Sequence, residues 1–414
     1  MAINRGMTMT KTEDGARVLI AGMGPAGVVA GLILCRAGIR VSLFEALADL
    51  PMDLRASTFH PPTLDYLAEL GLTDDLVAQG LIAPTYQWRD RRSGEAATFE
   101  MACLTDLTAF PFRLQCEQFK LTRIAVDRLR NEPLADLNFG EAACAVAQDE
   151  TGVRLTLEAT DGARREVRGD FLIGADGASS AVRRALDIPF EGFTYPEQWV
   201  VVSTPVDFAD LLPGLSPVSY TADSEEWYVL LRTPELWRVL IPVPDDADPD
   251  IVLSDAFLED KLQGVAARDE PYRIVHRTIY RVHQRVAETY HVGRVALAGD
   301  AAHINNPLGG MGMNGGIHDA VNLAQKLVRV FRNGADLDTM LDHYSRQRRA
   351  VAERYVLAHT DQNKRVIEER DPEKRAAHLA RMREVAASPE ALLAHVRKGA
   401  MIDAVAESMA VEPA

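Results

Sequence analysis

The hydrophobic pattern near the amino terminus is that of a strand, a helix and a second strand. Residues 17–21 (RVLIA) form a short apolar run, which predicts a buried strand. An apolar helical pattern then extends to Ala37, and Gly38 ends it. A second apolar run at 41–45 (VSLFE) predicts a strand parallel to the first, because a helix connects the two. The pattern indicates an α/β fold with a parallel sheet.

The same periodicities predict further elements downstream. Residues 61–71 begin with two prolines and place their leucines on one face, which predicts a helix ended by a glycine. Residues 117–130 form a second amphipathic helix. Residues 152–173 alternate between apolar and polar as strands do, and Asp161-Gly162 supplies the turn between two of them.

The character of the chain changes between about 189 and 271. Helical periodicity mostly disappears there while aromatic residues and prolines become frequent, which predicts an antiparallel sheet inserted as a separate lobe. A helix with one apolar face follows Gly315 and is capped by Gly334. The remaining residues are predicted to form charged helices that thin into a tail.

Composition narrows the possible partners. Sixty acidic and 45 basic side chains give a net charge of −15, which argues against a nucleic acid or an anionic membrane and leaves a small-molecule partner. Met1–Ala16 contain no apolar run and are expected to be a disordered leader instead of a signal peptide, and no stretch reaches the length of a membrane span. We expect a cytoplasmic protein, as a monomer or a homodimer.

The four cysteines are Cys35, Cys103, Cys116 and Cys144. They form no CxxC pair, and no histidine stands at metal-ligand spacing from them. Each lies in an apolar or helical context, so all four are expected to be buried free thiols. That usage fits a reducing cytoplasm, and no metal site is expected.

A glycine turn lies directly between the first strand and its helix. The turn reads Gly22-Met23-Gly24-Pro25-Ala26-Gly27 and fits the pattern G-x-G-x-x-G. Glycines permit a tight turn and let a pyrophosphate approach the amides at a helix N-terminus. Glu45, at the end of the second strand, is placed to accept hydrogen bonds from a ribose. These positions predict dinucleotide binding without separating NAD from FAD.

Two later segments select FAD. A buried strand runs into Asp176-Gly177, which alone is equally compatible with an ordinary turn. Another strand ends at Gly299-Asp300, where an acid can hold a ribityl or ribose hydroxyl. The glycine-rich loop at 309–315 then lets a flat ring lie against the backbone, at the positive end of the following helix. Because reduced flavin is anionic at its pyrimidine end, this arrangement favours the reduced cofactor.

In this order and spacing, the segments resemble the class A flavoprotein aromatic hydroxylases, the p-hydroxybenzoate hydroxylase-like FAD-dependent monooxygenases, over residues 18–327. The resemblance implies a Rossmann-like FAD-binding domain, an inserted antiparallel-sheet substrate domain and C-terminal helices. The expected boundaries are 15–77, 112–185 and 272–340 for the FAD-binding domain, 78–111 and 186–271 for the substrate domain, and 341–414 for the helical region.

The family's functional residues are carried over by matching positions. The resemblance implies FAD binding by Gly22, Gly24, Pro25, Ala26, Gly27, Glu45, Arg55, Gln118, Asp176, Gly299, Asp300, Pro307, Gly310, Gly312, Met313 and Asn314. Ser180 and Arg183 complete the Asp176 motif, which the family associates with both FAD and the nicotinamide coenzyme. Asn306 and Pro307 are expected beside the transferred oxygen atom and are the candidate catalytic residues.

The implied chemistry is hydroxylation of an aromatic or heteroaromatic small molecule. NADPH or NADH reduces the flavin, dioxygen adds to it, and the hydroperoxide delivers oxygen to an electron-rich ring. The alternatives are a flavin-dependent halogenase, another FAD oxidoreductase on this scaffold, or a flavin-binding protein without turnover. A halogenase carries W-x-W-x-I-P, and Val239 stands here in place of the second tryptophan. That substitution disfavours the halogenase.

Several other side chains are weaker candidates. His303 is expected to be a structural hydrogen-bonding residue, and His60 either lines the pocket mouth or starts a helix. In the predicted sheet, about half of the side chains should face away from a pocket. We therefore assign no catalytic role there to Tyr220, Tyr228, Arg232, Trp237 or Arg238, and a surface position is expected for both arginines.

Overall fold

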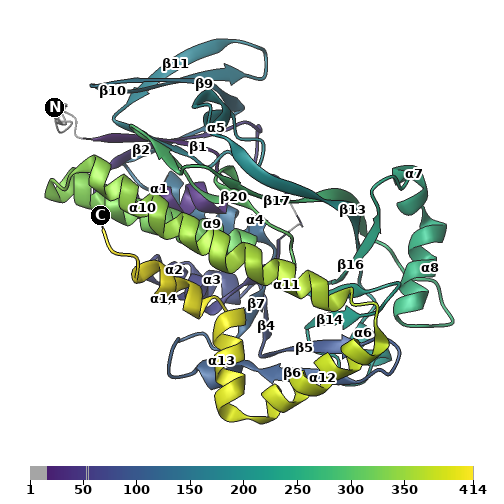
Figure 1. The fold of residues 1–414 in the computed structure, drawn as a ribbon. Coiled ribbons are helices and arrows are strands. Elements are labelled where there is room, and N and C mark those ends of the chain that lie inside the picture. The colour runs from purple at the N-terminus through teal and green to yellow at the C-terminus, as the bar shows by residue number, and fades with distance from the viewer. Residues whose placement is uncertain (1–15, 53, 55, 414) are drawn as a thin grey trace.

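The computed structural model of the chain describes residues 16–52, 54 and 56–413 (Figure 1). The expected leader, Met1–Ala16, lies outside the described residues except for Ala16, and Arg55 also lies outside them. Two large sheets form the body of the molecule, and a long rod of helices runs alongside both.

The first large sheet has six strands and is mostly parallel. In spatial order they are β18 (His291–Val292), β19 (Val295–Leu297), β12 (Phe171–Gly174), β1 (Arg17–Ala21), β2 (Arg40–Glu45) and β8 (Ala135–Phe139). Only β18 is antiparallel to its neighbour within this sheet. The central strands are almost wholly buried, as expected for a parallel sheet covered on both faces. The predicted parallel sheet is confirmed.

Helices cover one face of this sheet, and a small antiparallel sheet packs against its other face. The helices are α1 (Pro25–Arg36), α4 (Gln118–Arg130), α9 (Gly312–Asn333) and α10 (Leu337–Val351). Gly334 ends α9 in a left-handed conformation, φ 70°, as predicted. The small antiparallel sheet contains β9 (Glu141–Asp149), β10 (Gly152–Ala159) and β11 (Arg164–Gly169). Its β10–β11 turn contains Asp161-Gly162, also as predicted.

The second large sheet has eight strands. In spatial order they are β20 (His303–Ile304), β17 (His276–Ala287), β13 (Phe190–Thr204), β16 (Trp237–Pro244), β15 (Tyr228–Arg232), β14 (Val218–Ala222), β5 (Thr85–Asp90) and β6 (Ala96–Glu100). All neighbours are antiparallel except β14 and β5. The exception arises where β5, which comes from an earlier part of the chain together with β6, joins the inserted sheet at β14.

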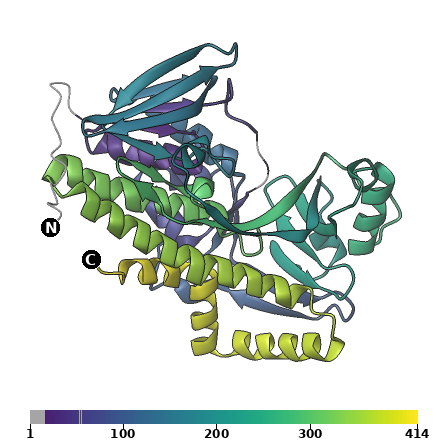
Figure 2. The ribbon, with the colours of Figure 1, turned by 45° about the horizontal axis from the view of Figure 1, so that its top comes forward.

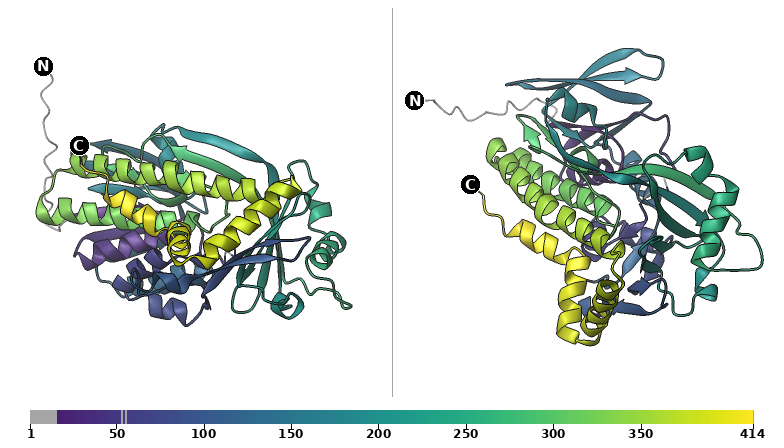
Figure 3. Two further views of the ribbon diagram at one scale, coloured as in Figure 1. Left: turned by 60° about the horizontal axis from the view of Figure 1, so that its bottom comes forward. Right: turned by 45° about the vertical axis from the view of Figure 1, so that its right-hand side comes forward.

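The two faces of the eight-stranded sheet are covered by different helices. On one face, α8 (Asp255–Val265) buries Leu258 and Leu262 against the strands. The sequence pattern gave little sign of this helix, which Ser254 caps. On the other face lie α12 (Pro372–Ala387) and α13 (Pro389–Gly399), which bury Leu379 and Val396. Figures 2 and 3 show these C-terminal helices, in yellow, beside the blue strands of the sheet.

The remaining elements connect these layers. They are β3 (Thr58–Phe59), α2 (Pro61–Glu69), α3 (Thr73–Val77), β4 (Leu81–Ala83), η1 (Met101–Leu104), β7 (Arg113–Gln115), α5 (Ala181–Ala185), α6 (Phe208–Leu211), α7 (Pro249–Val252), η2 (Gly299–Ala301), η3 (Ala352–Leu357), α11 (Ala358–Ile367) and α14 (Ile402–Met409). Strands β3, β7 and β4 pair as a three-stranded sheet. The segment η3 is a π-helix that joins α10 to α11.

Three sequence expectations need comment. Cys35 and Cys116 are buried, but Cys103 and Cys144 are partly exposed, so the expectation of four buried thiols is wrong for two of them; all four are free. No described helix combines the length and the apolar content that crossing a membrane requires. Strand β17 pairs with β13, so the eight-stranded sheet continues past residue 271, and the division into domains stays a proposal.

Candidate functional site

The glycine turn after β1 has three glycines with three different surroundings. A Cβ on Gly22, whose φ is 98°, would overlap the Ala175 carbonyl oxygen, and a Cβ on Gly27 would overlap that of Gly22. A Cβ on Gly24 would meet nothing within 4 Å. Gly22 and Gly27 are therefore needed for close packing. Gly24 leaves open space at the N-terminus of α1, which fits the approach of a pyrophosphate.

Glu45 lies beside this turn. Its Oε2 accepts a hydrogen bond from the Met23 amide at 3.0 Å, and its Oε1 accepts one from the Leu47 amide at 3.1 Å. The structure thus brings together the two parts of the predicted ADP site, although they are 18 or more residues apart in the chain. Each carboxylate oxygen keeps a second lone pair with which it can accept a ribose hydroxyl.

The third predicted segment turns sharply where it meets α1 and α9. Gly299 has φ 66°, and a Cβ built on Gly316 would lie 2.9 Å from its Cα. This close approach lets the short helix η2 sit against α9 and presents the exposed residue Asp300. Gly309 and Gly310 follow with φ values of 110° and 68°. Only glycine adopts these conformations readily, so the loop depends on them.

A cavity of about 410 Å³ opens between this glycine loop and the eight-stranded sheet. The predicted site residues that line it are Gln118, Asp300, Pro307, Gly310, Gly312 and Met313. The sheet contributes Tyr220, Val229, Leu231, Leu240, Tyr280, Arg281, Val282 and His283. The structure therefore joins the predicted flavin loop to the predicted substrate sheet around one space, with mostly apolar walls and a few polar groups.

Two of the predicted residues hold the loop and do not line the cavity. Asn306 is fully buried, donates from Nδ2 to the Tyr195 hydroxyl at 3.1 Å and accepts from the Leu308 amide at 3.1 Å. The side chain of Asn306 thus holds the loop, and the expectation that Asn306 lies beside the transferred oxygen atom stays a prediction. Asn314 donates to the Thr58 and Gly310 carbonyls, at 2.8 and 2.6 Å, and accepts from the His60 amide.

Asp176 caps a helix. Its Oδ2 accepts from the amides of Ala181 and Val182, at 2.7 and 3.1 Å, and its Oδ1 accepts from the Ser180 hydroxyl. Arg183 donates to the Ala301 carbonyl at 2.9 Å, so α5 is tied to the segment that carries Asp300. The Asp176 motif therefore connects α5 to the segment that carries Asp300, through hydrogen bonds between its side chains and backbone groups.

A buried charged network that the sequence did not reveal supports the same segment. Asp319 accepts from the Gly299 amide at 3.1 Å, from His303 Nε2 at 2.8 Å and from Arg348 Nε at 2.6 Å. Burial alone would raise the pKa of Asp319, but His303 and Arg348 outweigh it and hold that pKa below its usual value. His303 is thus a structural hydrogen-bonding residue, as predicted.

The other weak candidates occupy different positions, and most of them lie away from the cavity. His60 precedes α2, and its ring bonds to the Gly309 carbonyl at 2.8 Å, so it starts a helix. Tyr228 and Trp237 pack on the sheet face that α8 covers. Arg232 is partly buried and pairs with Asp207 at 3.3 Å. The expected surface position of Arg238 is wrong: it is buried and donates to Ser57 Oγ at 3.0 Å.

Strand β17 supplies cavity residues that sequence analysis missed. Four consecutive residues of this strand, Tyr280 to His283, line the cavity, but the strand lay outside the stretch interpreted as substrate sheet. His283 bonds through Nδ1 to Thr194 Oγ1 at 2.8 Å. Burial, followed by Arg285 and Arg281, lowers its pKa, so His283 is neutral at physiological pH.

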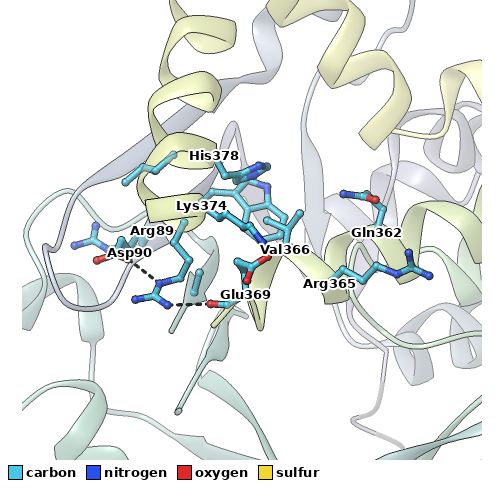
Figure 4. A pocket seen from close by; sticks show the side chains of 12 residues that line it. Arg89, Asp90, Gln362, Arg365, Val366, Glu369, Lys374 and His378 are labelled. Atoms are coloured by element: carbon cyan, nitrogen blue, oxygen red, sulfur yellow. Dashed lines mark hydrogen bonds and ion pairs between the residues drawn. The ribbon is translucent and has the colours of Figure 1, made fainter. Parts of the chain in front are cut away.

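A second, smaller cavity of about 230 Å³ lies between β5, α11 and α12 (Figure 4). Its cations are largely paired: Arg375 lies 3.6 Å from Asp90, and Arg365 lies 2.8 Å from Asp361. Trp88 forms part of its wall and stacks on Tyr220 of the larger cavity, with ring centroids 5.0 Å apart. Within the described residues, no cluster of histidine, cysteine, aspartate or glutamate is arranged to hold a metal ion.

Comparison with known proteins identifies the fold and its chemistry. The model of the FAD binding domain family matches residues 15–359. The chain is 33% identical over 384 residues to para-nitrophenol 4-monooxygenase of Pseudomonas sp. (strain WBC-3), covering 90% of this chain and 92% of the relative. It is 34% identical over 338 residues to 6-hydroxy-3-succinoylpyridine 3-monooxygenase of Pseudomonas putida, covering 80% and 84%.

Solved structures agree with these relatives. The crystal structure of p-nitrophenol 4-monooxygenase from Pseudomonas putida DLL-E4 superposes with a TM-score of 0.87 at 30% identity, covering 94% of this chain and 99% of that one. Aklavinone-11 hydroxylase, solved with FAD and aklavinone, superposes with a TM-score of 0.75 at 26% identity, covering 87% and 70%. A flavin-dependent halogenase is similar at 23% identity and a TM-score of 0.71, which shows the shared fold alone.

Proposed function

The chain belongs to the FAD binding domain family and is a class A flavoprotein aromatic monooxygenase, and we propose that it hydroxylates a small phenol or hydroxypyridine in the 410 Å³ cavity. The relatives named above act on p-nitrophenol and on a hydroxylated pyridine, both single rings that carry a hydroxyl group. The cavity that joins the glycine loop to the sheet is the observation that carries the proposal.

The residues present fit FAD. The open space beside Gly24 and the carboxylate of Glu45 suit the ADP half, and Asp300 with the loop at 310–313 suits the ribityl chain and the ring. Bound FAD, reduced by NAD(P)H, supplies the oxygen-transfer chemistry. Hydrogen bonds of Gly299 and Asn314 hold the turn and the loop of this site, and Asp176 bonds to α5 beside it. The role of each individual residue in FAD binding, including Arg55, remains part of the proposal.

The chain's own residues position the ring and keep water away. Apolar side chains of the sheet, including Val229, Leu240 and Val282, give the cavity dry walls, in which electrostatic interactions are stronger than in water. Pro307 lines the cavity, where the sequence predicted the reacting region. Helix α9 begins at Gly312, and its N-terminus directs partial positive charge toward the cavity.

The main alternative, a halogenase, is disfavoured by the position of Val239. This residue stands where the halogenase pattern requires its second tryptophan, and it is fully buried in the core under α8. Its side chain therefore faces away from the cavity, on the opposite side of the sheet from Tyr220 and Leu240.

Turnover with a panel of rings tests the proposal. FAD-loaded protein is mixed with NADH or NADPH, oxygen and a series of 4-substituted phenols and hydroxypyridines, and products are identified by mass spectrometry. We expect at least one ring to accelerate NAD(P)H oxidation and to appear with an added oxygen atom. Hydrogen peroxide as the sole product across the whole panel would show that the proposed substrate class is wrong.

A further inference from the structure

Asn306 lies directly before Pro307, and groups from two strands of the large sheet fix its position. Asn306 is fully buried. Its Nδ2 donates a hydrogen bond to the hydroxyl of Tyr195, on β13, at 3.1 Å. Its backbone amide donates to Oε1 of Gln284, on β17, at 3.4 Å. The conformation of the chain at Asn306 is therefore set by side chains that are distant in the sequence.

Pro307 depends on its neighbours for its place at the cavity. It lines the cavity, has no amide hydrogen and has a nearly fixed φ, so it cannot be held through its own N–H group. On one side Asn306 is fixed as described. On the other side the Leu308 amide donates to Asn306 Oδ1 at 3.1 Å, and the Leu308 carbonyl accepts from Asn363 Nδ2, on α11, at 3.3 Å. The cavity wall at Pro307 thus depends partly on a helix that the sequence did not connect with the site.

Tyr195 is held by α11 at its hydroxyl and at its ring. Its hydroxyl donates to Asp361 Oδ1 at 3.2 Å, and the ammonium of Lys364 lies 5.2 Å from the centre of its ring. Lys364 in turn pairs with Glu197 at 2.8 Å, where the pairing of β13 with β17 shifts its register. Burial raises the pKa of Tyr195 to about 12, so its hydroxyl stays protonated. It can therefore donate to Asp361 and accept from Asn306 at the same time.

The π-helix before α11 is connected to the same residue. Gln284 is buried, and its Nε2 donates to the carbonyl of Leu357, the last residue of η3, at 3.0 Å. A π-helical turn inside a longer helix is rare and is frequently found at functional sites. Gln284 links η3 to the backbone of Asn306, as Tyr195 links α11 to its side chain. Both connections run from the C-terminal helices to the residue before Pro307.

We propose that Tyr195, together with Asp361, is a positioning residue that fixes Asn306 and Pro307 against the cavity, so that oxygen transfer to the ring outcompetes release of hydrogen peroxide. This inference deepens the proposed function and rests on it. In both outcomes NAD(P)H and a proton from water reduce dioxygen by two electrons. Hydroxylation places one oxygen atom in the ring and releases the other as water, whereas the unproductive reaction releases both as hydrogen peroxide. Because a misplacement of about 1 Å can cost about a hundredfold in rate, a displaced wall should slow the transfer selectively.

The partition between the two products tests this role. Tyr195→Phe removes the hydroxyl and keeps the ring. With a ring that the wild type oxygenates, the oxygenated product and hydrogen peroxide are measured for each NAD(P)H consumed. We expect the product ratio to fall by about threefold or more in Tyr195→Phe, with hydrogen peroxide making up the difference, while KM for the ring stays within about twofold. Asp361→Asn keeps an oxygen that can accept from Tyr195 and should retain the wild-type ratio, whereas Asp361→Leu should lower it.

Hydrogen exchange measures the loop without turnover. In FAD-loaded enzyme without NAD(P)H, the backbone amides of 304–313 should exchange about threefold or more faster in Tyr195→Phe than in the wild type. Tyr228→Phe removes the same group from the opposite face of the sheet and should change neither the exchange nor the product ratio. Melting temperature and FAD content show whether each variant is folded. Asp361 is partly exposed, so Asp361→Leu provides a second test if Tyr195→Phe does not fold.

The outcomes separate this inference from a structural role and from the proposed function. An unchanged product ratio in a folded Tyr195→Phe or Asp361→Leu variant would overturn the inference, even where the loop exchanges faster, because the contact would then serve the fold alone. A raised KM at an unchanged ratio would overturn it as well, since the contact would then affect binding of the ring. The proposed function fails separately, when the wild type oxygenates no ring of the turnover panel.

Discussion

At the scale of single residues, two aspartates near the flavin loop, Asp300 and Asp319, have different surroundings. Asp300 is exposed and lines the cavity. Asp319 is fully buried and is shared between the Gly299 amide, His303 and Arg348. We propose that the first binds the cofactor, whereas the second holds the turn that presents the first. Substitutions at the two positions should therefore separate binding from stability.

Asp300→Ala is expected to weaken FAD retention by tenfold or more while leaving the free energy of unfolding of the FAD-free protein nearly unchanged. A lost hydrogen bond between a charged group and a ligand costs about 1.5–3 kcal/mol, and substitutions of exposed side chains usually change stability by less than about 0.5 kcal/mol. Fluorescence of released FAD and urea unfolding measure the two quantities. Unchanged FAD affinity would contradict the site assignment.

Asp319→Asn should instead destabilise the fold by about 3–5 kcal/mol, because it leaves the Arg348 guanidinium buried without its partner. The folded-state pKa of Asp319 is lowered, so its contribution is present above the ordinary value of 3.8 and is lost as the pH falls below it. Urea unfolding at several pH values should show a smaller acid-induced loss in the variant than in the wild type. The exposed Asp127→Asn serves as control.

Sequence alone predicted the residues whose role is local and missed those whose role depends on distant contacts. The glycine turn, Glu45 and Asp300 stand beside predicted strand ends, so their positions follow from the α/β topology. Asp319 on α9 and Arg348 on α10 are 29 residues apart in the chain, and no local pattern distinguishes their buried pair from surface charges. The orientation of Asn306 is set by Tyr195, which is 111 residues away.

At the scale of elements, the turn between β1 and α1 combines close packing with open space at a helix N-terminus in six residues. Gly27 packs against the carbonyl of Gly22, whereas Gly24 adjoins open space with an ordinary φ of −68°. Helix α1 was also easier to predict from the sequence than α8. Helix α1 follows a glycine turn and is mostly apolar, whereas α8 mixes apolar and charged residues within a stretch whose other residues predicted strands.

Alanine substitutions in this turn should give opposite results. Gly24→Ala is compatible with the backbone and should keep the FAD-free protein as stable as the wild type, yet reduce FAD affinity because its methyl group occupies the open space. Gly27→Ala must displace backbone and should cost about 1–3 kcal/mol of stability. Melting temperature and FAD titration measure both effects. Equal stability losses would contradict the assignment of Gly24 to ligand binding.

At the scale of the whole molecule, the C-terminal helices belong to the substrate side of the site. Ile367, Leu379 and Val396 pack in the same core as Tyr220 and Leu240, which line the cavity. The glycine turn and the strands around it pack in a separate core. Figure 3 shows the C-terminal helices, in yellow, following the rod of α10 and α11 and turning back along the blue strands. The wall of the cavity thus depends on a part of the chain that carries none of the predicted site residues.

Ile367→Ala tests this division between the two cores. Ile367 is fully buried, so the substitution should destabilise the protein by about 2–5 kcal/mol. Because the lost packing lies on the substrate side, the dissociation constant of a phenolic ligand should rise while that of FAD stays within about twofold. Urea unfolding and separate titrations of both ligands at a temperature where the variant is folded provide the measurement, with the exposed Ile251→Ala as control. Selective loss of FAD would show that the cores are not independent.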